Sequence, residues 1–136
     1  MAAFPYRAVL VAATLALVLG GCGATDSDGA AGAAERLYAA YADQDGETAC
    51  AQFSDDTREQ LEKDERKPCP EAVLALDLSG TRVTGEQAYV TEAKVEIDGG
   101  DSVFVEETGE HGWLVTAAGC RPVPDQEAPY DCEVES

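Results

Sequence analysis

Two side chains in this sequence have the chemical types that acid–base catalysis uses, Asp77 and His111. Asp77 stands between two leucines, and a carboxylate with apolar neighbours is the kind that enzymes tune for proton transfer. His111 lies in the turn Glu110-His111-Gly112. A water-facing aspartate at a helix end and a solvated turn histidine explain both positions more simply, so the two are weak catalytic candidates. Nucleophilic catalysis has less support, because no serine or free cysteine stands beside the histidine in a known motif.

Two acidic turns carry the oxygen ligands that calcium prefers: Asp43-Gln44-Asp45-Gly46-Glu47 and Asp98-Gly99-Gly100-Asp101. Neither follows the EF-hand loop, which needs glycine at its sixth position and glutamate at its twelfth. Counted from Asp43, the glycine falls at the fourth position and a serine at the twelfth. The sequence therefore predicts ordinary turns and no metal site.

The N-terminal segment has the order of an export signal. Arg7 precedes the uncharged, mostly aliphatic run Ala8 to Leu19, and Leu19-Gly20-Gly21-Cys22 follows. This tetrapeptide resembles the lipobox of bacterial lipoproteins, in which Cys22 would take a diacylglyceryl group and become the mature N-terminus. A spanning helix needs about 20 apolar residues, more than this run offers, and a plain secretory signal would leave Cys22 free. We expect a signal peptide over residues 1–21 and a lipid anchor at the extracytoplasmic face of the cell membrane.

Four further cysteines remain once Cys22 is assigned to lipid: Cys50, Cys69, Cys120 and Cys132. An even number in an exported domain predicts two disulfides, for which three pairings are possible. We favour Cys50 with Cys69 and Cys120 with Cys132, because each pair closes a short loop. The rival interpretation is a zinc site, but the sequence has no Cys-x-x-Cys pair and its one histidine lies nine residues from the nearest cysteine.

Acidic residues dominate the chain. Asp and Glu number 27 against nine Lys and Arg, for a net charge of −18. Such a field repels nucleic acid and anionic lipid headgroups, so a nucleic-acid partner is excluded. Two interpretations remain, a surface kept soluble outside the cell and a surface for cationic partners or metal ions, and the first is the simpler.

The small, polar residues after Cys22 predict a flexible tether, so we assign residues 22–32 to the lipidated N-terminus and tether, and 33–136 to one folded domain. Apolar residues at helical spacing predict a first amphipathic helix from Ala33 to Tyr41. The turn Asp43-Gln44-Asp45-Gly46 would end it.

Two more helices are predicted before the chain changes character. Thr48 is expected to cap a short turn, and Asp56 with Glu59 resembles a capping box for a very polar second helix. Pro68-Cys69-Pro70 would stop that helix and start a third, apolar one from Glu71 to Leu78.

After Gly80 the apolar residues alternate, which predicts antiparallel strands. The predicted strands are Arg82–Thr84, Ala88–Ile97, Ser102–Glu106, Trp113–Ala117 and Tyr130–Val134. The apolar parity changes within the second run, which predicts a bulge near Thr91 or Glu92 and hence a curved sheet. Hairpin turns are expected at Asp98–Asp101 and, more loosely, at Thr108–Gly112. Helices followed by a curved sheet make an α+β domain, with the helices on one face.

This order, with Tyr38-Ala39-Ala40-Tyr41-Ala42-Asp43 closing the first helix, resembles the NTF2-like (SnoaL-like) superfamily. A closer likeness is to small exported proteins of actinobacteria, in the tracts 112–120 and 129–134, and the resemblance covers about residues 33–134. It implies N-terminal helices packed on a curved antiparallel sheet of about five strands. In that superfamily the resulting cone binds a small apolar ligand, or isomerises, cyclises or dehydrates one. The chain departs from the pattern in its short second and third helices, and offers no match to the enzymes' catalytic residues.

Six aromatic residues could line such a pocket or fill the core: Tyr38, Tyr41, Phe53, Tyr89, Phe104 and Trp113. Together these observations predict a noncatalytic, lipid-anchored module that binds a surface protein or a small apolar ligand, without cofactor or metal. The alternatives are an NTF2-like enzyme acting on a small apolar molecule, and a structural envelope protein with no pocket. A cavity that holds an ionisable pair would favour the enzyme.

Overall fold

The computed structural model describes residues 29–127 and 129–136. The predicted signal peptide, Cys22 and most of the predicted tether lie outside the described residues. The helices come first: α1 (Ala30–Ala42), α2 (Gly46–Cys50), α3 (Asp55–Glu65), α4 (Cys69–Ala72) and the 3-10 helix η1 (Val73–Ala75). The strands follow: β1 (Val83–Tyr89), β2 (Glu92–Ile97), β3 (Ser102–Glu107), β4 (Trp113–Pro122), β5 (Tyr130–Asp131) and β6 (Val134–Glu135). The chain is therefore mixed, with helices N-terminal to an antiparallel sheet.

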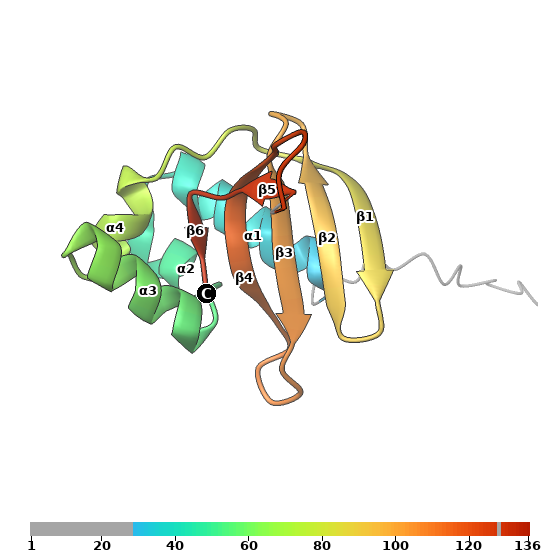
Figure 1. Cartoon of the computed structure of the whole chain (residues 1–136). Coiled ribbons are helices and arrows are strands. Elements are labelled where there is room, and N and C mark those ends of the chain that lie inside the picture. Colours follow the sequence, from blue (N-terminus) through green and yellow to red (C-terminus); the bar gives the residue numbers. More distant parts are fainter. Residues whose placement is uncertain (1–28, 128) are drawn as a thin grey trace, which may run out of the picture.

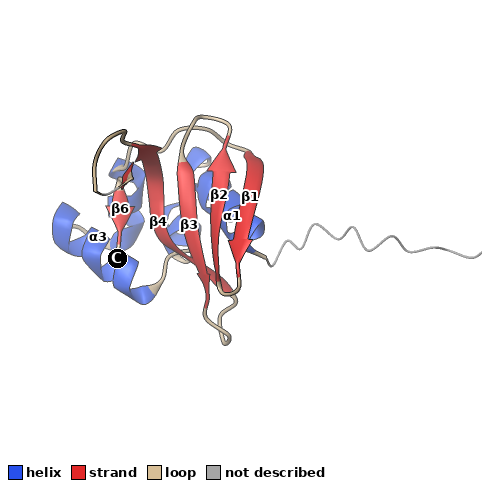
Figure 2. Cartoon of the chain, turned by 45° about the vertical axis from the view of Figure 1, so that its right-hand side comes forward, coloured by secondary structure: helices blue, strands red, loops and turns tan. Residues whose placement is uncertain are grey.

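The sheet is a meander in the order β1-β2-β3-β4, with every neighbour antiparallel, and the short β5 and β6 both pair with β4. Helix α1 lies behind these strands and contacts all four of the meander (Figure 1). The view in Figure 2 shows the same two layers, with α3 beyond the β6 edge. Within residues 29–127 and 129–136, α1 contacts all four strands of the meander while α3 contacts the edge formed by β4 and β6, although the sequence predicted that all the helices would cover one face. Helix α3 has just Thr57 and Leu61 buried, too narrow an apolar stripe to cover a sheet face.

Alternation along the strands gives the sheet two different faces. Val95 of β2 and Val103 and Val105 of β3 are buried, and they point toward α1. We call this the covered face. The residues between them, Lys94 and Phe104, point the other way and pair across the strands. We call that side the open face, which β5 crosses at one end (Figure 1).

The first helix begins at Ala30, before the predicted Ala33. Ala30 and Gly32, assigned to the tether from sequence, are buried, so that part of the tether prediction is wrong. Contacts with the sheet explain the earlier start of the helix. Its small residues let the helix lie close to the sheet, and the Ala31 N–H donates to the Glu86 carboxylate of β1 at 3.2 Å. Further along α1, Leu37 and Tyr38 are wholly buried and fill the layer between helix and strands.

Both predicted helix caps are wrong. Asp45 caps α2 and accepts hydrogen bonds from the Thr48 amide at 3.1 Å and the Thr48 hydroxyl. Ser54 caps α3 and accepts from the Thr57 amide at 3.3 Å, so the helix begins before Asp56. A side chain that caps must stand just outside the first turn, and each predicted cap lies inside the helix.

The third predicted helix, Glu71 to Leu78, is much shorter. Regular helix ends at Ala72, η1 ends at Ala75, and Leu76 is extended with ψ 155°. Leu76 and Leu78 are buried while Asp77 between them is exposed, an alternation that only extended backbone gives. The Tyr41 hydroxyl donates to the Leu76 carbonyl at 2.6 Å and holds this segment against α1.

The predicted strand Ala88–Ile97 is two strands. The chain reverses at Val90 and Thr91, so that Tyr89 pairs with Glu92, and the parity change that suggested a bulge marks a hairpin turn. The turns at Asp98–Asp101 and Thr108–Gly112 lie between strands as predicted, with Gly100 at φ 93°. Register shifts within β1–β2 and β3–β4 are irregularities of the kind that bend a sheet.

Two disulfides pin the domain. Cys50–Cys69 joins α2 to α4, and Cys120–Cys132 joins β4 to the segment between β5 and β6. Both are the pairs predicted from their short loops. The first lies among the helices and the second beside the open face.

Candidate functional site

The structure divides the six aromatic residues between core and surface. Tyr38 and Phe53 are wholly buried, and Tyr41 and Trp113 are partly buried against the same core. Tyr89, which is 61% exposed, and the half-buried Phe104 lie on the open face. Tyr38 and Phe53 therefore help the aliphatic side chains to fill the core, and of the six residues Tyr89 and Phe104 line a cleft on the open face.

A cleft of about 330 Å³ lies on the open face. Its lining comes from β1, β2, β3, β4 and the C-terminal residue: Tyr89, Glu92, Ala93, Lys94, Phe104, Val105, Glu106, Thr116 and Ser136. Ligand pockets in proteins start at about 300 Å³, so the cleft is large enough for a small ligand or for one side chain of a partner. We call it the open-face cleft.

An aromatic and cationic group borders this cleft. The Phe104 and Tyr130 rings meet edge to face with centroids 5.2 Å apart. The Lys94 ammonium lies 6.0 Å from the Tyr130 ring centre and 3.1 Å from a Glu96 carboxylate oxygen. Hydrogen bonds to Glu96 and then to the Tyr130 hydroxyl raise the pKa of Lys94. Lys94 is therefore a charged group with partners of its own.

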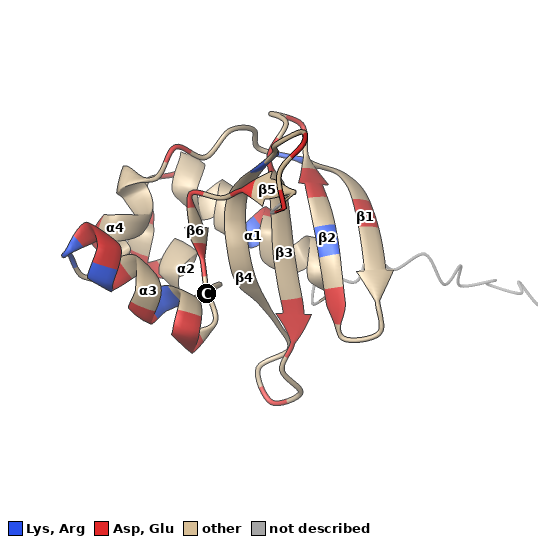
Figure 3. Ribbon diagram, viewed as in Figure 1, with Lys and Arg blue, Asp and Glu red and all other residues tan. Residues whose placement is uncertain are grey.

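Acidic side chains stand at the other end of the cleft. Figure 3 shows acidic positions at the adjoining ends of β2 and β3. There Glu92 and Glu106 are direct cross-strand partners, and both are exposed. The pair was missed from the sequence although the turn Asp98–Asp101, which joins β2 to β3, was predicted, because the bulge expected near Thr91 or Glu92 left the pairing of Glu92 unassigned.

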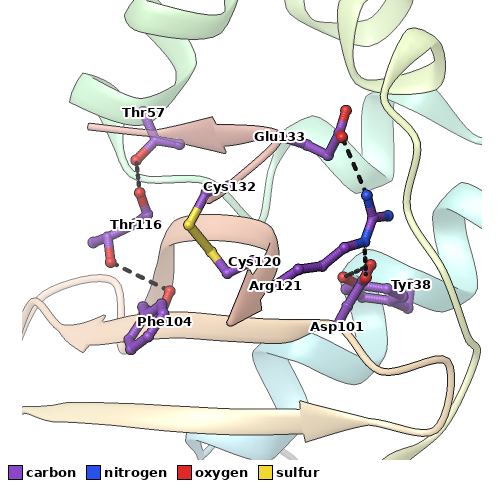
Figure 4. Close-up of a disulfide and its surroundings, with 9 residues drawn as sticks. All are labelled: Tyr38, Thr57, Asp101, Phe104, Thr116, Cys120, Arg121, Cys132 and Glu133. Carbon is purple, nitrogen blue, oxygen red and sulfur yellow. Dashed lines mark hydrogen bonds and ion pairs between the residues drawn. A yellow bond between two sulfur atoms is a disulfide. The ribbon is translucent and has the colours of Figure 1, made fainter. Parts of the chain in front are cut away.

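A second polar cluster centres on Asp101, just before β3 (Figure 4). The Asp101 side chain is wholly buried and accepts hydrogen bonds from the Tyr38 hydroxyl at 2.9 Å, the Ser79 amide at 2.7 Å and Arg121 Nε at 3.2 Å. Arg121, which follows Cys120, also places Nη1 3.6 Å from an oxygen of Glu133, which follows Cys132 (Figure 4).

This cluster is a structural junction. Burial, reinforced by the Asp101 carboxylate, raises the pKa of Tyr38 far above its ordinary value, so the hydroxyl stays protonated. Tyr38 is fully enclosed and its one hydroxyl is occupied by Asp101, which leaves it no route to a substrate. The network instead ties α1, the segment before β1, and β4 together across the chain.

The two catalytic candidates lie apart from the open-face cleft. The Asp77 side chain is 82% exposed and lies 3.8 Å from Arg121 Nη2, while the Asp77 carbonyl accepts from the same guanidinium at 2.7 Å. His111 is exposed in the loop between β3 and β4. Neither residue is among those that line the cleft.

The acidic turns that suggested calcium are used for local structure. Hydrogen bonds from the Thr48 hydroxyl and amide lower the pKa of Asp45. Backbone amides of Thr81 and Arg82 do the same for Asp98. Over residues 29–127 and 129–136, no three His, Cys, Asp or Glu side chains are grouped so as to hold a metal ion. In the same part of the chain, none of the helices has both the length and the apolar character needed to cross a bilayer.

Comparison of the chain with protein-family models, with curated proteins and with solved structures finds no match.

Proposed function

We propose that this protein is a lipid-anchored binding module on the extracytoplasmic side of the cell membrane, and that the open face of its sheet receives the partner. The observation that carries the proposal is the open-face cleft, a hollow of about 330 Å³ with Tyr89 and Phe104 in its lining, on the sheet face opposite α1. Exposed aromatic side chains beside a hollow are typical of binding surfaces.

The anchor is proposed from the sequence alone. Leu19-Gly20-Gly21-Cys22 follows a short apolar run, and the two disulfides fit an oxidising compartment. The Cys22→Ala variant should be released or misprocessed, which cell fractionation and gel mobility would measure. A Cys22→Ala protein of mature size that stays in the membrane fraction would contradict the anchor.

We also propose the NTF2-like superfamily as the origin of the fold, supported by the order of helices and then a bent antiparallel sheet. Binding is favoured over catalysis because Asp77 and His111 are exposed away from the cleft, and because the Tyr38–Asp101 pair is sealed in the interior. Turnover of a small apolar carbonyl compound, abolished by Asp77→Asn or His111→Ala, would reverse this preference.

Site-specific photocrosslinking tests the open face directly. Gln87 pairs with Lys94 and is exposed on this face, whereas Glu47 is exposed on α2 among the helices. A photoreactive residue at Gln87 in intact cells should give a discrete crosslinked product that the same residue at Glu47 does not. Identical products from both positions, or none from Gln87, would reject the open face as the binding surface.

A further inference from the structure

We infer that the partner of the open face is a basic segment of another protein, which places a lysine or arginine side chain between Glu92 and Glu106. The inference rests on the proposed function, because it names the occupant of the same face.

The charge pattern of the open face is incomplete without a cation. Glu92 and Glu106 are direct cross-strand partners, and like charges in that position destabilise a sheet. Neither glutamate takes part in any ion pair formed by the described residues. Proteins usually keep a destabilising arrangement of this type where it serves a function, such as binding. A cation supplied from outside would remove the repulsion.

The neighbouring lysine does not supply this cation. Lys94 is two residues from Glu92 on the same face, but its ammonium is held 3.1 Å from Glu96 and bonds the Tyr130 hydroxyl at 3.5 Å. The charge of Lys94 is therefore neutralised by Glu96, at the end of the cleft away from Glu92 and Glu106. The open-face cleft thus has an internally neutralised end and an end with two unneutralised carboxylates.

The apolar groups around the carboxylates fit a long basic side chain. Tyr89 pairs with Glu92 across the first hairpin, and Phe104 lies in the same cleft. Lysine and arginine bury an aliphatic stem while the charged head reaches a polar partner, and both heads are attracted to aromatic rings. The cleft offers aromatic surface for the stem and two carboxylates for the head.

The tip of the first hairpin indicates a protein partner rather than a small amine. Val90 is 98% exposed, next to Tyr89 at 61%, and takes a positive φ of 33°. A β-branched residue is disfavoured in that conformation, where glycine or asparagine would serve the turn better. A small amine inside the cleft would leave this apolar tip in water, whereas a polypeptide crossing the cleft can cover it as well.

The test uses the purified full-length protein and a fluorescein-labelled peptide of alternating lysine and leucine, followed by fluorescence anisotropy. The same peptide with acetylated lysines is the neutral control. We expect the lysine peptide to bind and the acetylated peptide to bind at least about tenfold more weakly, the loss of roughly one charge-assisted contact. Glu92→Gln/Glu106→Gln should weaken binding of the lysine peptide by a similar factor.

A matched charge control separates a site from a diffuse acidic field. Glu47→Gln/Glu71→Gln removes two exposed carboxylates from α2 and α4 and gives the same net charge. It should change binding less than twofold. In the free protein Glu92→Gln/Glu106→Gln should raise Tm by about 1 to 4 °C over the native protein, because it relieves the cross-strand repulsion. This second readout does not depend on the choice of peptide. Glu47→Gln/Glu71→Gln serves as the control for binding alone, since both residues lie in the first turn of a helix, where a carboxylate is stabilising.

Each failure has a distinct meaning. Equal weakening by both double variants would overturn the inference in favour of unspecific attraction. Equal binding of both peptides, lost in Tyr89→Ser, would overturn the cation while leaving the open face as the binding surface. Absence of peptide binding together with an unchanged Tm in Glu92→Gln/Glu106→Gln would also overturn it, and the proposed function would then stand or fall on the Gln87 crosslink alone.

Discussion

Along β2, consecutive residues meet two different environments. Val95 is wholly buried under α1, while its neighbours Lys94 and Glu96 lie on the open face and pair with each other. The same alternation continues in β3, where Val103 and Val105 are buried and Glu106 is exposed. The covered face is uniform and apolar, as packing requires, whereas the open face mixes aromatic, cationic and unpaired acidic groups.

The two faces of the sheet therefore have different roles: the covered face stabilises the fold, and the open face is the proposed binding surface. Burial of aliphatic side chains on the covered face contributes about 1.5 to 3 kcal/mol for each residue of valine or leucine size. The Glu92 and Glu106 pair on the open face works against stability by up to about 1 kcal/mol. Substitutions on the covered face should therefore change folding, and substitutions on the open face should chiefly change binding.

The largest expected effect comes from placing one carboxylate on each face. Val103→Asp would put an unpaired charge beneath α1 and should lower the free energy of unfolding by more than about 4 kcal/mol, enough to abolish a cooperative transition. Gln87→Asp on the open face should cost less than about 0.5 kcal/mol. Urea denaturation followed by circular dichroism measures both. Similar losses in the two variants would mean that the faces do not differ as described.

Next in size are the disulfides, one on each side of the molecule. Replacing either pair with serines should lower the free energy of unfolding by about 3 kcal/mol, the loop-entropy value for loops of this length. Only Cys120→Ser/Cys132→Ser should also weaken peptide binding, because Cys132 holds the segment that carries Tyr130 over Phe104. Thermal unfolding and anisotropy on both variants make the comparison. Equal binding losses would remove the link between this disulfide and the open face.

Tyr38 connects the covered layer to the buried Asp101 and should give a smaller, pH-dependent effect. Unfolded tyrosine loses its proton near pH 10, but burial and Asp101 raise the folded pKa well above that. The folded state thus retains a proton that the unfolded state releases, so this stabilisation is complete below about pH 10 and is lost as the pH rises further.

Tyr38→Phe should remove that alkaline decline and cost about 1 to 2 kcal/mol at neutral pH, because Asp101 loses a donor. Urea titrations from pH 7 to 11 measure both effects. Tyr89→Phe, on the open face, is the control and should keep the decline. A Tyr38→Phe protein with an undiminished decline would assign the alkaline sensitivity to other groups.

Much of the fold could be predicted from local pattern, because alternation after Gly80 and helical spacing before it are properties of neighbouring residues. The turn at Val90 and Thr91 could not, since neither residue is a usual turn former. Ser54 was missed as a cap because Ser54, Asp55 and Asp56 are three consecutive residues of capping type, and only the surrounding contacts choose among them.

The candidate site was harder to predict than the fold. Tyr89 and Phe104 were among the predicted pocket residues, but so were Tyr38 and Phe53, which fill the core. The Tyr38–Asp101 bond joins residues 63 positions apart, and no spacing rule anticipates such a contact. The Glu92–Glu106 pair depends on the register of β2 against β3, and the bulge predicted near Thr91 or Glu92 left the position of Glu92 in that register open.

The smallest expected effect concerns Asp98, at the turn where β2 passes into β3. Hydrogen bonds from the Thr81 and Arg82 amides lower its pKa, so the folded state favours the ionised carboxylate. Its stabilisation is therefore present above the ordinary aspartate pKa of about 3.9 and is lost as the pH falls through the lower folded value. The Tm difference between the native protein and Asp98→Asn should be largest above about pH 5 and should shrink toward pH 2.

Asp131→Asn, another exposed aspartate, is the control, and an equal pH dependence in the two variants would mean that the turn contacts of Asp98 do not contribute to stability. Because Asp98 belongs to neither face, peptide binding at neutral pH should be unchanged, and this separates a loss of turn stability from a loss of the open face.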